Sequence, residues 1–127
     1  MRLASLMNVN SLFIFTHDSI YLGEDGPTHQ PIEHLMSLRL IPNLDVIRPS
    51  NSMELIHSYR YALEKRDNPK AIILSRQNMK FFDNDVSYKD FQTGAYEFMP
   101  GSDITLIATG SEPVSYTHLT LPTMAIV

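Results

Sequence analysis

Short apolar runs alternate with amphipathic, helix-like segments along the first half of the chain. Apolar residues dominate positions 11–15, 44–47 and 71–74, and each run has the length of a strand that is buried on both faces. Between these runs, the spacing of apolar residues predicts helices that begin at Pro31 and after Asn51. Strands that alternate with helices pair in parallel through right-handed crossovers. We therefore predict an α/β fold, a partial doubly wound parallel sheet.

Local signals predict where the helices begin and end. Residues 1–8 have a helix-like composition. Asn51 and Glu54 have the spacing of a capping box, with Asn in place of the usual Ser or Thr. The helix after this cap is expected to end near Arg66, because Asp67, Asn68 and Pro69 follow. Its predicted apolar face consists of Leu55, Ile56, Tyr59, Ala62 and Leu63.

The second half of the chain has a less regular pattern. Residues 77–99 mix polar and apolar positions without a clear period. The apolar run at 103–109 predicts a fourth strand, which a turn at Gly110 follows. We expect a connector between domains at 86–102 and the first strand of a further domain at 103–112.

Composition and charge exclude several classes of partner. The chain has 127 residues, 43% of them hydrophobic and 19% charged, which suits one folded domain in water. Its net charge of -4 gives no reason to expect a nucleic acid or an anionic membrane as partner. No apolar run approaches the roughly 18 residues of a membrane span. Since cysteine is absent, there is no disulfide or thiolate metal site, and we expect a cytoplasmic protein.

Polar side chains follow two of the predicted strands. Residues 16–19 come directly after the first strand, and residues 75–78 follow the third. Ligands of open parallel sheets bind beyond the carboxyl ends of the strands. Guanidinium and imidazolium groups suit a phosphate, whereas a carboxylate accepts hydrogen bonds from sugar hydroxyls. The loop between His17 and His29 adds two carboxylates, Glu24 and Asp25. The sequence therefore predicts a site for a phosphorylated polyol, formed by His17, His29, Arg76 and one of these carboxylates.

Other readings of the same residues are open. Arg76 alone would suit a surface ion pair, and a lone loop histidine is often a cap or a solvated side chain. The two loop histidines could suggest zinc, but the sequence shows no compact set of three ligands, so we predict no metal site. A Ser-His-Asp triad built on Ser19 or Ser75 lacks the nucleophile-elbow spacing. His34 and His57 fall on predicted helices, where surface or packing roles are expected.

Taken together, several strings resemble the signature of the transketolase family. They are FTHDSI at 15–20, GEDGPTHQP at 23–31, AIILSRQN at 71–78 and GSDITLIATGSE at 101–112. The paired dipeptides Leu38-Arg39, Pro42-Asn43 and Arg48-Pro49 continue the likeness. The resemblance covers residues 1–112 and implies that 1–85 is the C-terminal part of the pyrimidine-binding domain. Dihydroxyacetone synthase shares much of this pattern and stays an alternative.

The resemblance implies an activity, cofactors and residue roles. Transketolases use thiamine diphosphate and Mg²⁺ to move a two-carbon ketol unit from a ketose phosphate to an aldose phosphate. They are homodimers that bind the cofactor between subunits. In the family, the positions that match His17 and Arg76 bind the substrate phosphate, and the position that matches Asp25 contacts a sugar hydroxyl. The position that matches His29 lies close to the cofactor and the first carbons of the substrate.

The resemblance also predicts what this chain does not do alone. The catalytic glutamate of the family and most cofactor ligands belong upstream of Met1, so the isolated chain is expected to be an inactive fragment. The alternative is a stand-alone sugar-phosphate-binding module or one subunit of a split transketolase. After Glu112 the likeness ends, and residues 113–127 are expected to be a non-native tail. Residues 114–123 resemble translated adapter DNA, and a diverged extended tail is the other reading.

Overall fold

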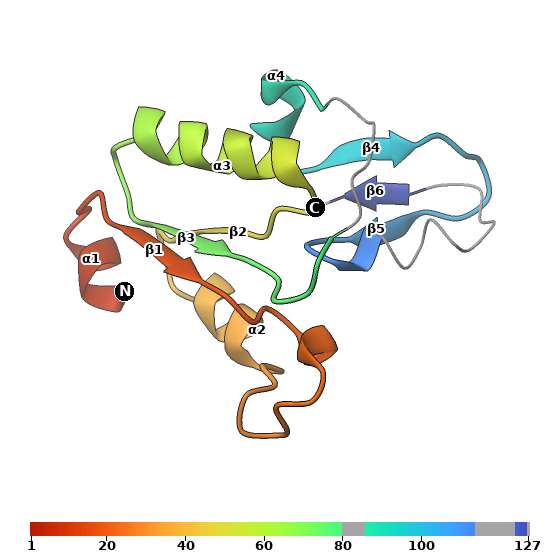
Figure 1. The fold of residues 1–127 in the computed structure, drawn as a ribbon. Helices are drawn as coiled ribbons and strands as arrows, with labels where there is room; N and C mark the ends of the chain where they lie inside the picture. Colours follow the sequence, from red (N-terminus) through yellow and green to blue (C-terminus); the bar gives the residue numbers. More distant parts are fainter. Residues whose placement is uncertain (80–85, 114–123, 127) are drawn as a thin grey trace.

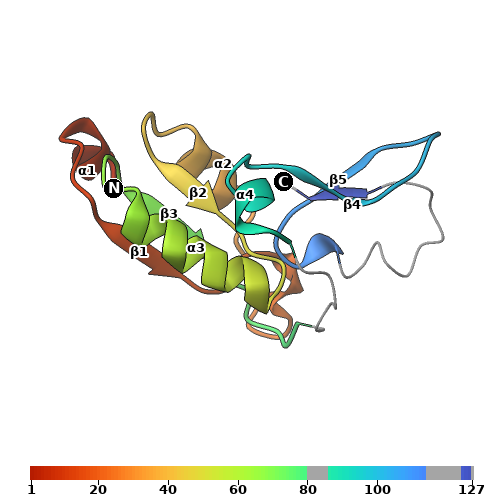
Figure 2. The same cartoon turned by 90° about the horizontal axis from the view of Figure 1, so that it is seen from above.

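The chain forms two three-stranded sheets with short helices around them (Figure 1, Figure 2). The structure is a computed structural model, and it describes residues 1–79, 86–113 and 124–126. The first half contains α1 (Arg2–Leu6), β1 (Leu12–Phe15), the 3-10 helix η1 (Ile20–Leu22), α2 (His34–Arg39), β2 (Asp45–Ile47), α3 (Ser52–Glu64) and β3 (Lys70–Ile73). The second half contains α4 (Tyr88–Phe91), β4 (Tyr96–Met99), β5 (Leu106–Ala108) and β6 (Met124–Ile126).

The first sheet confirms the predicted α/β fold with parallel strands. Its order is β1-β3-β2, and both pairings are parallel. The register pairs Phe15 with Ile73 and Ile47 with Ile72, so all three strands end at the same edge. Figure 1 shows α3 on one side of this sheet and α1 and α2 on the other. Each crossover therefore carries a helix, as the alternating sequence pattern predicts.

Burial differs between the strands. All four residues of β3 are buried, because β3 is the central strand of the first sheet. The prediction that 11–15 is buried on both faces is wrong. Leu12, Ile14 and Phe15 are 39%, 48% and 38% exposed, because β1 has a strand partner on one side only among the described residues. An apolar run therefore marks a strand here without fixing how deeply it is buried.

Helix α2 starts later than predicted, and helix α3 ends at Glu64 and not near Arg66. Helix α2 begins at His34 and not at Pro31. Ile32 is 76% exposed, so no packing holds an earlier turn in place. Helix α3 begins as predicted, because Asn51 Oδ1 accepts the Glu54 N–H at 2.9 Å. The Glu54 carboxylate accepts the N–H of Ser50 at 2.5 Å, one residue before the position expected for a capping box.

The predicted apolar face of α3 is partly wrong. Ile56 and Leu63 are 58% and 63% exposed, whereas the buried positions are Glu54, His57, Ser58 and Ala62. The buried polar side chains have partners that the sequence does not reveal. Ser58 Oγ donates to the Glu54 carbonyl at 2.6 Å, and Tyr96 Oη donates to the Glu54 carboxylate. His57 packs as expected, with Nε2 2.8 Å from the Val86 carbonyl oxygen, and His34 is exposed.

The second sheet contains the strand predicted near the C-terminal end. Its order is β4-β6-β5, with β4 antiparallel and β5 parallel to β6. The predicted strand at 103–109 is shorter than expected and spans only Leu106–Ala108. The expected connector, 86–102, contains α4 and β4, so it is more regular than its sequence pattern indicates. Of the expected non-native tail, 114–123 and 127 lie outside the described residues; the domain boundaries and the tail's origin stay predictions.

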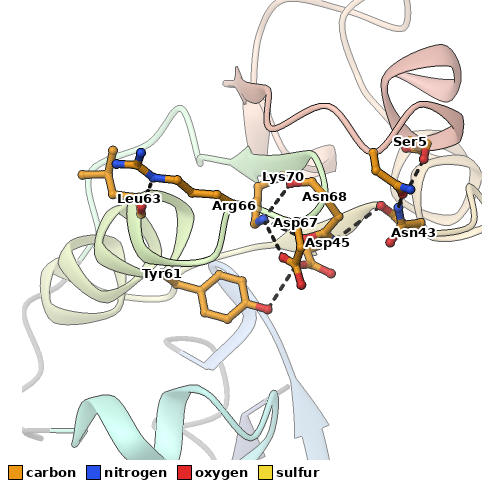
Figure 3. A network of polar contacts seen from close by, with 10 residues as sticks. Ser5, Asn43, Asp45, Tyr61, Leu63, Arg66, Asp67, Asn68 and Lys70 are labelled. Atoms are coloured by element: carbon orange, nitrogen blue, oxygen red, sulfur yellow. Dashed lines mark hydrogen bonds and ion pairs between the residues drawn. The ribbon is translucent and has the colours of Figure 1, made fainter.

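A polar network closes the amino edge of the first sheet (Figure 3). Lys70 is fully buried, and its Nζ donates to the Asn68 carbonyl at 2.6 Å and to Asn68 Oδ1 at 2.7 Å. Asn68 Nδ2 in turn donates to the Asn43 carbonyl at 3.4 Å, and Asn43 Nδ2 donates to the Ser5 carbonyl at 3.2 Å. This network connects β3 to the loop before β2 and to α1. The buried ammonium is tolerated because it is hydrogen-bonded.

An arginine network closes the opposite, carboxyl edge and joins the two sheets. Arg48, directly after β2, donates from Nη2 to Asp18 at 2.6 Å and from Nη1 to Glu112 at 2.9 Å. The side chains of Arg48 and Asp18 are 2% and 1% exposed. The Arg48 carbonyl accepts the Gly110 N–H at 3.1 Å. Three chain segments, which follow β1, β2 and β5, therefore meet at one guanidinium.

Gly110 is the position where a side chain would disturb this network. Its φ is +62°, and a Cβ there would lie 2.8 Å from Arg48 Cζ. We expect Gly110→Ala to lower the free energy of unfolding by about 2 kcal/mol, from the left-handed backbone and the displaced guanidinium together. Gly94→Ala is the matched control, because φ is +82° there and nothing lies within 4 Å of the added Cβ. Urea unfolding measures the loss in the free energy of unfolding for each variant, and equal losses in the two variants would contradict the role given to Gly110.

The Tyr96–Glu54 contact between β4 and α3 predicts a pH dependence. Burial, and then the hydrogen bond to Glu54, raise the pKa of Tyr96 well above its ordinary value. An unfolded tyrosine ionises near pH 10, so above this pH the unfolded chain holds fewer protons than the folded chain. Stability should therefore fall as the pH rises beyond about 10. Tyr96→Phe should flatten this decline by up to about 1.4 kcal/mol per pH unit, measured by urea unfolding between pH 8 and 11. An unchanged slope would refute the assignment.

Candidate functional site

The candidate site lies at the carboxyl edge of the first sheet. β1 and β3 are adjacent and parallel, and the Leu74 N–H donates to the Phe15 carbonyl at 2.8 Å just where both strands end. The two polar segments predicted from the sequence, 16–19 and 75–78, therefore leave the sheet side by side. In Figure 1 and Figure 2 the loop after β1 and the segment after β3 lie close together. Ligands of parallel sheets bind at such an edge.

His17 has an unusual backbone conformation. Its φ is +67°, in the left-handed region that residues other than glycine rarely adopt. Its side chain is half-buried, and its Nδ1 lies 2.8 Å from Thr16 Oγ1. It lines a cavity of about 260 Å³ between the ends of β1 and β3 and helix α2. A strained residue at a sheet edge is typical of positions where the surrounding structure holds a functional group in place.

Asp25 and Arg76 come together from segments 51 positions apart in the sequence. Arg76 Nε lies 3.5 Å from Asp25 Oδ2, and the two side chains are 52% and 41% exposed. This distance is longer than a direct hydrogen bond, so the ion pair is loose and contributes little to stability. Gly23 and Gly26, with φ of +91° and +78°, provide the turns on either side of Asp25. The guanidinium can therefore exchange its carboxylate partner for a ligand at small cost.

His29 lies in the same long loop and is exposed. Its Nδ1 is 2.9 Å from Thr28 Oγ1, just as His17 Nδ1 contacts the threonine that precedes it. The structure thus pairs Asp25 with Arg76 and places His17 at the same sheet edge. For both histidines the observed contacts run to the preceding threonine and not to the other candidate residues.

A second, larger cavity lies elsewhere, beside β2. It has a volume of about 390 Å³ and is lined by Asp45, Glu54, Tyr61 and Tyr96, among other residues. Its carboxylates are already engaged, because Tyr61 Oη donates to Asp45 at 3.0 Å and Tyr96 Oη donates to Glu54. These four groups satisfy one another, whereas Arg76 at the carboxyl edge is only loosely paired, so we take the carboxyl edge as the candidate site. Size alone does not identify the site.

The sequence analysis missed Arg48 and Glu112 as members of this edge. Both stand within strings that resemble the family, but no role follows from their spacing, because they are 64 positions apart. The available signal is Arg48 itself, a charged residue that directly follows a predicted strand and precedes a proline. Arg48 binds Asp18, the residue next to His17, in a buried contact, and Glu112 binds the same guanidinium.

The described residues contain no group of three or more His, Cys, Asp or Glu side chains that could hold a metal ion. Within the same residues, no helix is long and apolar enough to cross a membrane.

Comparisons with known proteins identify the family. The family model of the transketolase pyrimidine-binding domain matches residues 1–81. A transketolase of Buchnera aphidicola from Schizaphis graminum is 50% identical over 115 residues, which cover 87% of this chain and 17% of that protein. A transketolase of Halalkalibacterium halodurans is 47% identical over 116 residues, with the same two coverages. The chain therefore spans about 17% of the length of these curated relatives.

Solved structures agree with this result. A Pichia stipitis transketolase variant in complex with fructose 6-phosphate superposes with a TM-score of 0.86 at 35% identity, over 98% of this chain and 20% of that one. The Campylobacter jejuni transketolase has a TM-score of 0.84 at 38% identity, over 99% of this chain and 21% of that one. An inactive β4 tetramer of a split-gene transketolase shares the fold, with a TM-score of 0.70 at 20% identity. The chain belongs to the transketolase family, and its first 81 residues match the pyrimidine-binding domain of that family.

Proposed function

We propose that this chain is the part of a transketolase that holds the phosphate end of the sugar substrate during two-carbon ketol transfer. The observation that carries the proposal is the loose Asp25–Arg76 pair at the edge where His17 also leaves the sheet. An arginine that is half-exposed and weakly paired has a guanidinium free to bind two phosphate oxygens. An imidazole from the adjacent strand end adds a further donor.

Each candidate residue has a distinct role in this proposal. Arg76 and His17 bind the phosphate, and phosphate binding draws the Arg76 guanidinium away from Asp25. The released carboxylate of Asp25 then accepts a hydrogen bond from a sugar hydroxyl, since a carboxylate repels phosphate but suits a hydroxyl donor. The glycines on either side keep this carboxylate on a tight, exposed turn. Together these groups fix the sugar at both its phosphate and its hydroxyls, which orients the carbons that react.

His29 is the one candidate residue proposed to lie near the cofactor. Thiamine diphosphate, when bound, supplies a ring that stabilises the carbanion of the ketol unit. His29 fits a place beside it, because the Thr28 contact engages Nδ1 and leaves Nε2 for a ligand. As the family resemblance implies, we propose that other parts of the enzyme bind Mg²⁺ and the diphosphate. We also propose a cytoplasmic homodimer, as the family resemblance implies.

A hybrid enzyme tests the phosphate-binding role. Residues 1–112 of this chain replace the aligned segment of the Buchnera relative, to which the chain is 50% identical. Arg76→Gln should raise the KM for fructose 6-phosphate by about tenfold to a hundredfold, the equivalent of one lost charge-assisted contact of roughly 1.5–3 kcal/mol. His17→Ala should raise it by a smaller factor. Neither change should alter the KM for fructose, which has no phosphate.

Arg66→Gln is the matched control, because Arg66 is exposed and its Nε donates to the Leu63 carbonyl at 3.0 Å, at the amino edge. An inactive hybrid, or equal effects of Arg76→Gln on both sugars, would contradict the proposal. The isolated chain, given thiamine diphosphate, Mg²⁺ and two sugar phosphates, should transfer no ketol unit. Transfer above background would show that this chain contains a complete active site.

A further inference from the structure

We propose that Arg48 is a positioning residue for the substrate phosphate, acting on His17 through Asp18. This inference rests on the phosphate-binding role proposed for His17. Arg48 itself does not face the ligand edge, since its side chain is 2% exposed and both of its Nη groups bond to carboxylates. Its effect on the substrate is therefore indirect and passes through the backbone of the loop that follows β1.

His17 needs an anchor on each side to hold its left-handed backbone. On one side, Phe15 is fixed in the sheet, because its carbonyl accepts the Leu74 N–H at 2.8 Å. On the other side, Asp18 is 3% exposed and binds Arg48 Nη2 at 2.6 Å. The observed bond of the His17 side chain is to its exposed neighbour Thr16, which is too local to fix the backbone. The Asp18–Arg48 pair is therefore the anchor that holds φ at +67°.

Arg48 also compensates the negative charge of Asp18, which would otherwise oppose phosphate binding. Asp18 directly follows His17, and an unpaired carboxylate there would repel a phosphate dianion. Asp18 Oδ1 has no hydrogen-bond partner among the described residues, so Arg48 provides the observed compensation for this buried carboxylate. A planar guanidinium is suited to this because it reaches two carboxylates from separate nitrogens.

The same arginine connects the site to the second sheet. Arg48 Nη1 donates to Glu112 Oε1 at 2.9 Å, and Glu112 Oε2 accepts the Thr109 N–H at 3.1 Å, directly after β5. The missing side chain of Gly110 leaves room for the guanidinium. Glu112 thus links Arg48 to the segment after β5, and Arg48 in turn holds Asp18 in the loop after β1.

The hybrid enzyme tests this inference by comparing fructose 6-phosphate with fructose. Arg48→Lys keeps the charge, but one ammonium cannot reproduce the two-nitrogen fork, so the KM for fructose 6-phosphate should rise about tenfold. The kinetics with fructose should change much less. Lys70→Met is the structural control: it removes a buried cation at the opposite edge, so any effect should be equal for both sugars.

Asp18→Asn gives a second test, and it disturbs the fold less than Arg48→Lys. The direction of the change in the KM for fructose 6-phosphate separates a role as a nearby charge from a role as an anchor. If Asp18 acted only as a nearby negative charge, its removal would lower the KM for fructose 6-phosphate. As an anchor for His17, its loss should raise this KM by about fivefold, because a neutral amide binds the guanidinium more weakly than a carboxylate.

The outcomes distinguish the inference from the proposed function. A lower KM in Asp18→Asn, no change in both variants, or equal losses on both sugars would overturn the positioning role of Arg48. If instead Arg76→Gln and His17→Ala show no selectivity for the phosphorylated sugar, the proposed function itself fails. Both the inference and the proposed function are supported if the KM rises for fructose 6-phosphate more than for fructose in all four variants. These variants are Arg76→Gln, His17→Ala, Arg48→Lys and Asp18→Asn.

Discussion

One buried ion pair network holds the carboxyl side of this chain together. Arg48 binds Asp18 and Glu112 at 2.6 Å and 2.9 Å, and these residues follow three different strands. A buried carboxylate or guanidinium is costly unless it is paired, so the three segments must meet for the fold to be stable. Gly110 completes the arrangement, because its lack of a side chain lets the guanidinium approach the backbone. Asp18, the residue that follows His17, is held by this network.

The two edges of the first sheet use buried charge in different ways. At the amino edge, Lys70 is satisfied entirely by neighbours, chiefly Asn68, and connects secondary structure (Figure 3). At the carboxyl edge, the Asp18–Arg48 pair is buried, whereas the Asp25–Arg76 pair is exposed and loosely bonded. Positioning of a ligand needs well-held side chains and ligand exchange needs weak contacts, and this edge has both kinds of contact.

The chain is short compared with the relatives that share its family. The chain spans about 17% of its curated transketolase relatives, yet residues 1–81 match one domain model. A parallel sheet brings the ends of β1 and β3 together with only 62 residues between Leu12 and Ile73, both included. A compact unit of this size can therefore bring the candidate residues His17 and Arg76 to one edge of the sheet.

Much of the architecture follows from the sequence alone. The apolar runs at 11–15, 44–47 and 71–74 each coincide with a strand to within one residue, and the Asn51 cap begins α3 where predicted. These signals are local, because strand formation depends on a short apolar run and a cap depends on residues three positions apart. Polar residues directly after two parallel strands were also enough to predict one shared edge.

Only the tertiary structure decided the rest. Which helix face is buried depended on partners far along the chain, as Glu54 shows by binding Tyr96 across 42 positions. The exposure of β1 depended on its place at the end of the sheet, and the left-handed backbone of His17 depended on the anchor formed by Asp18 and Arg48. The sequence by itself determined the strands, the α/β class and the chemical types at the edge, because those depend on neighbours along the chain. The tertiary structure alone decided which charges meet, because a pairing between distant residues exists only once the chain has folded.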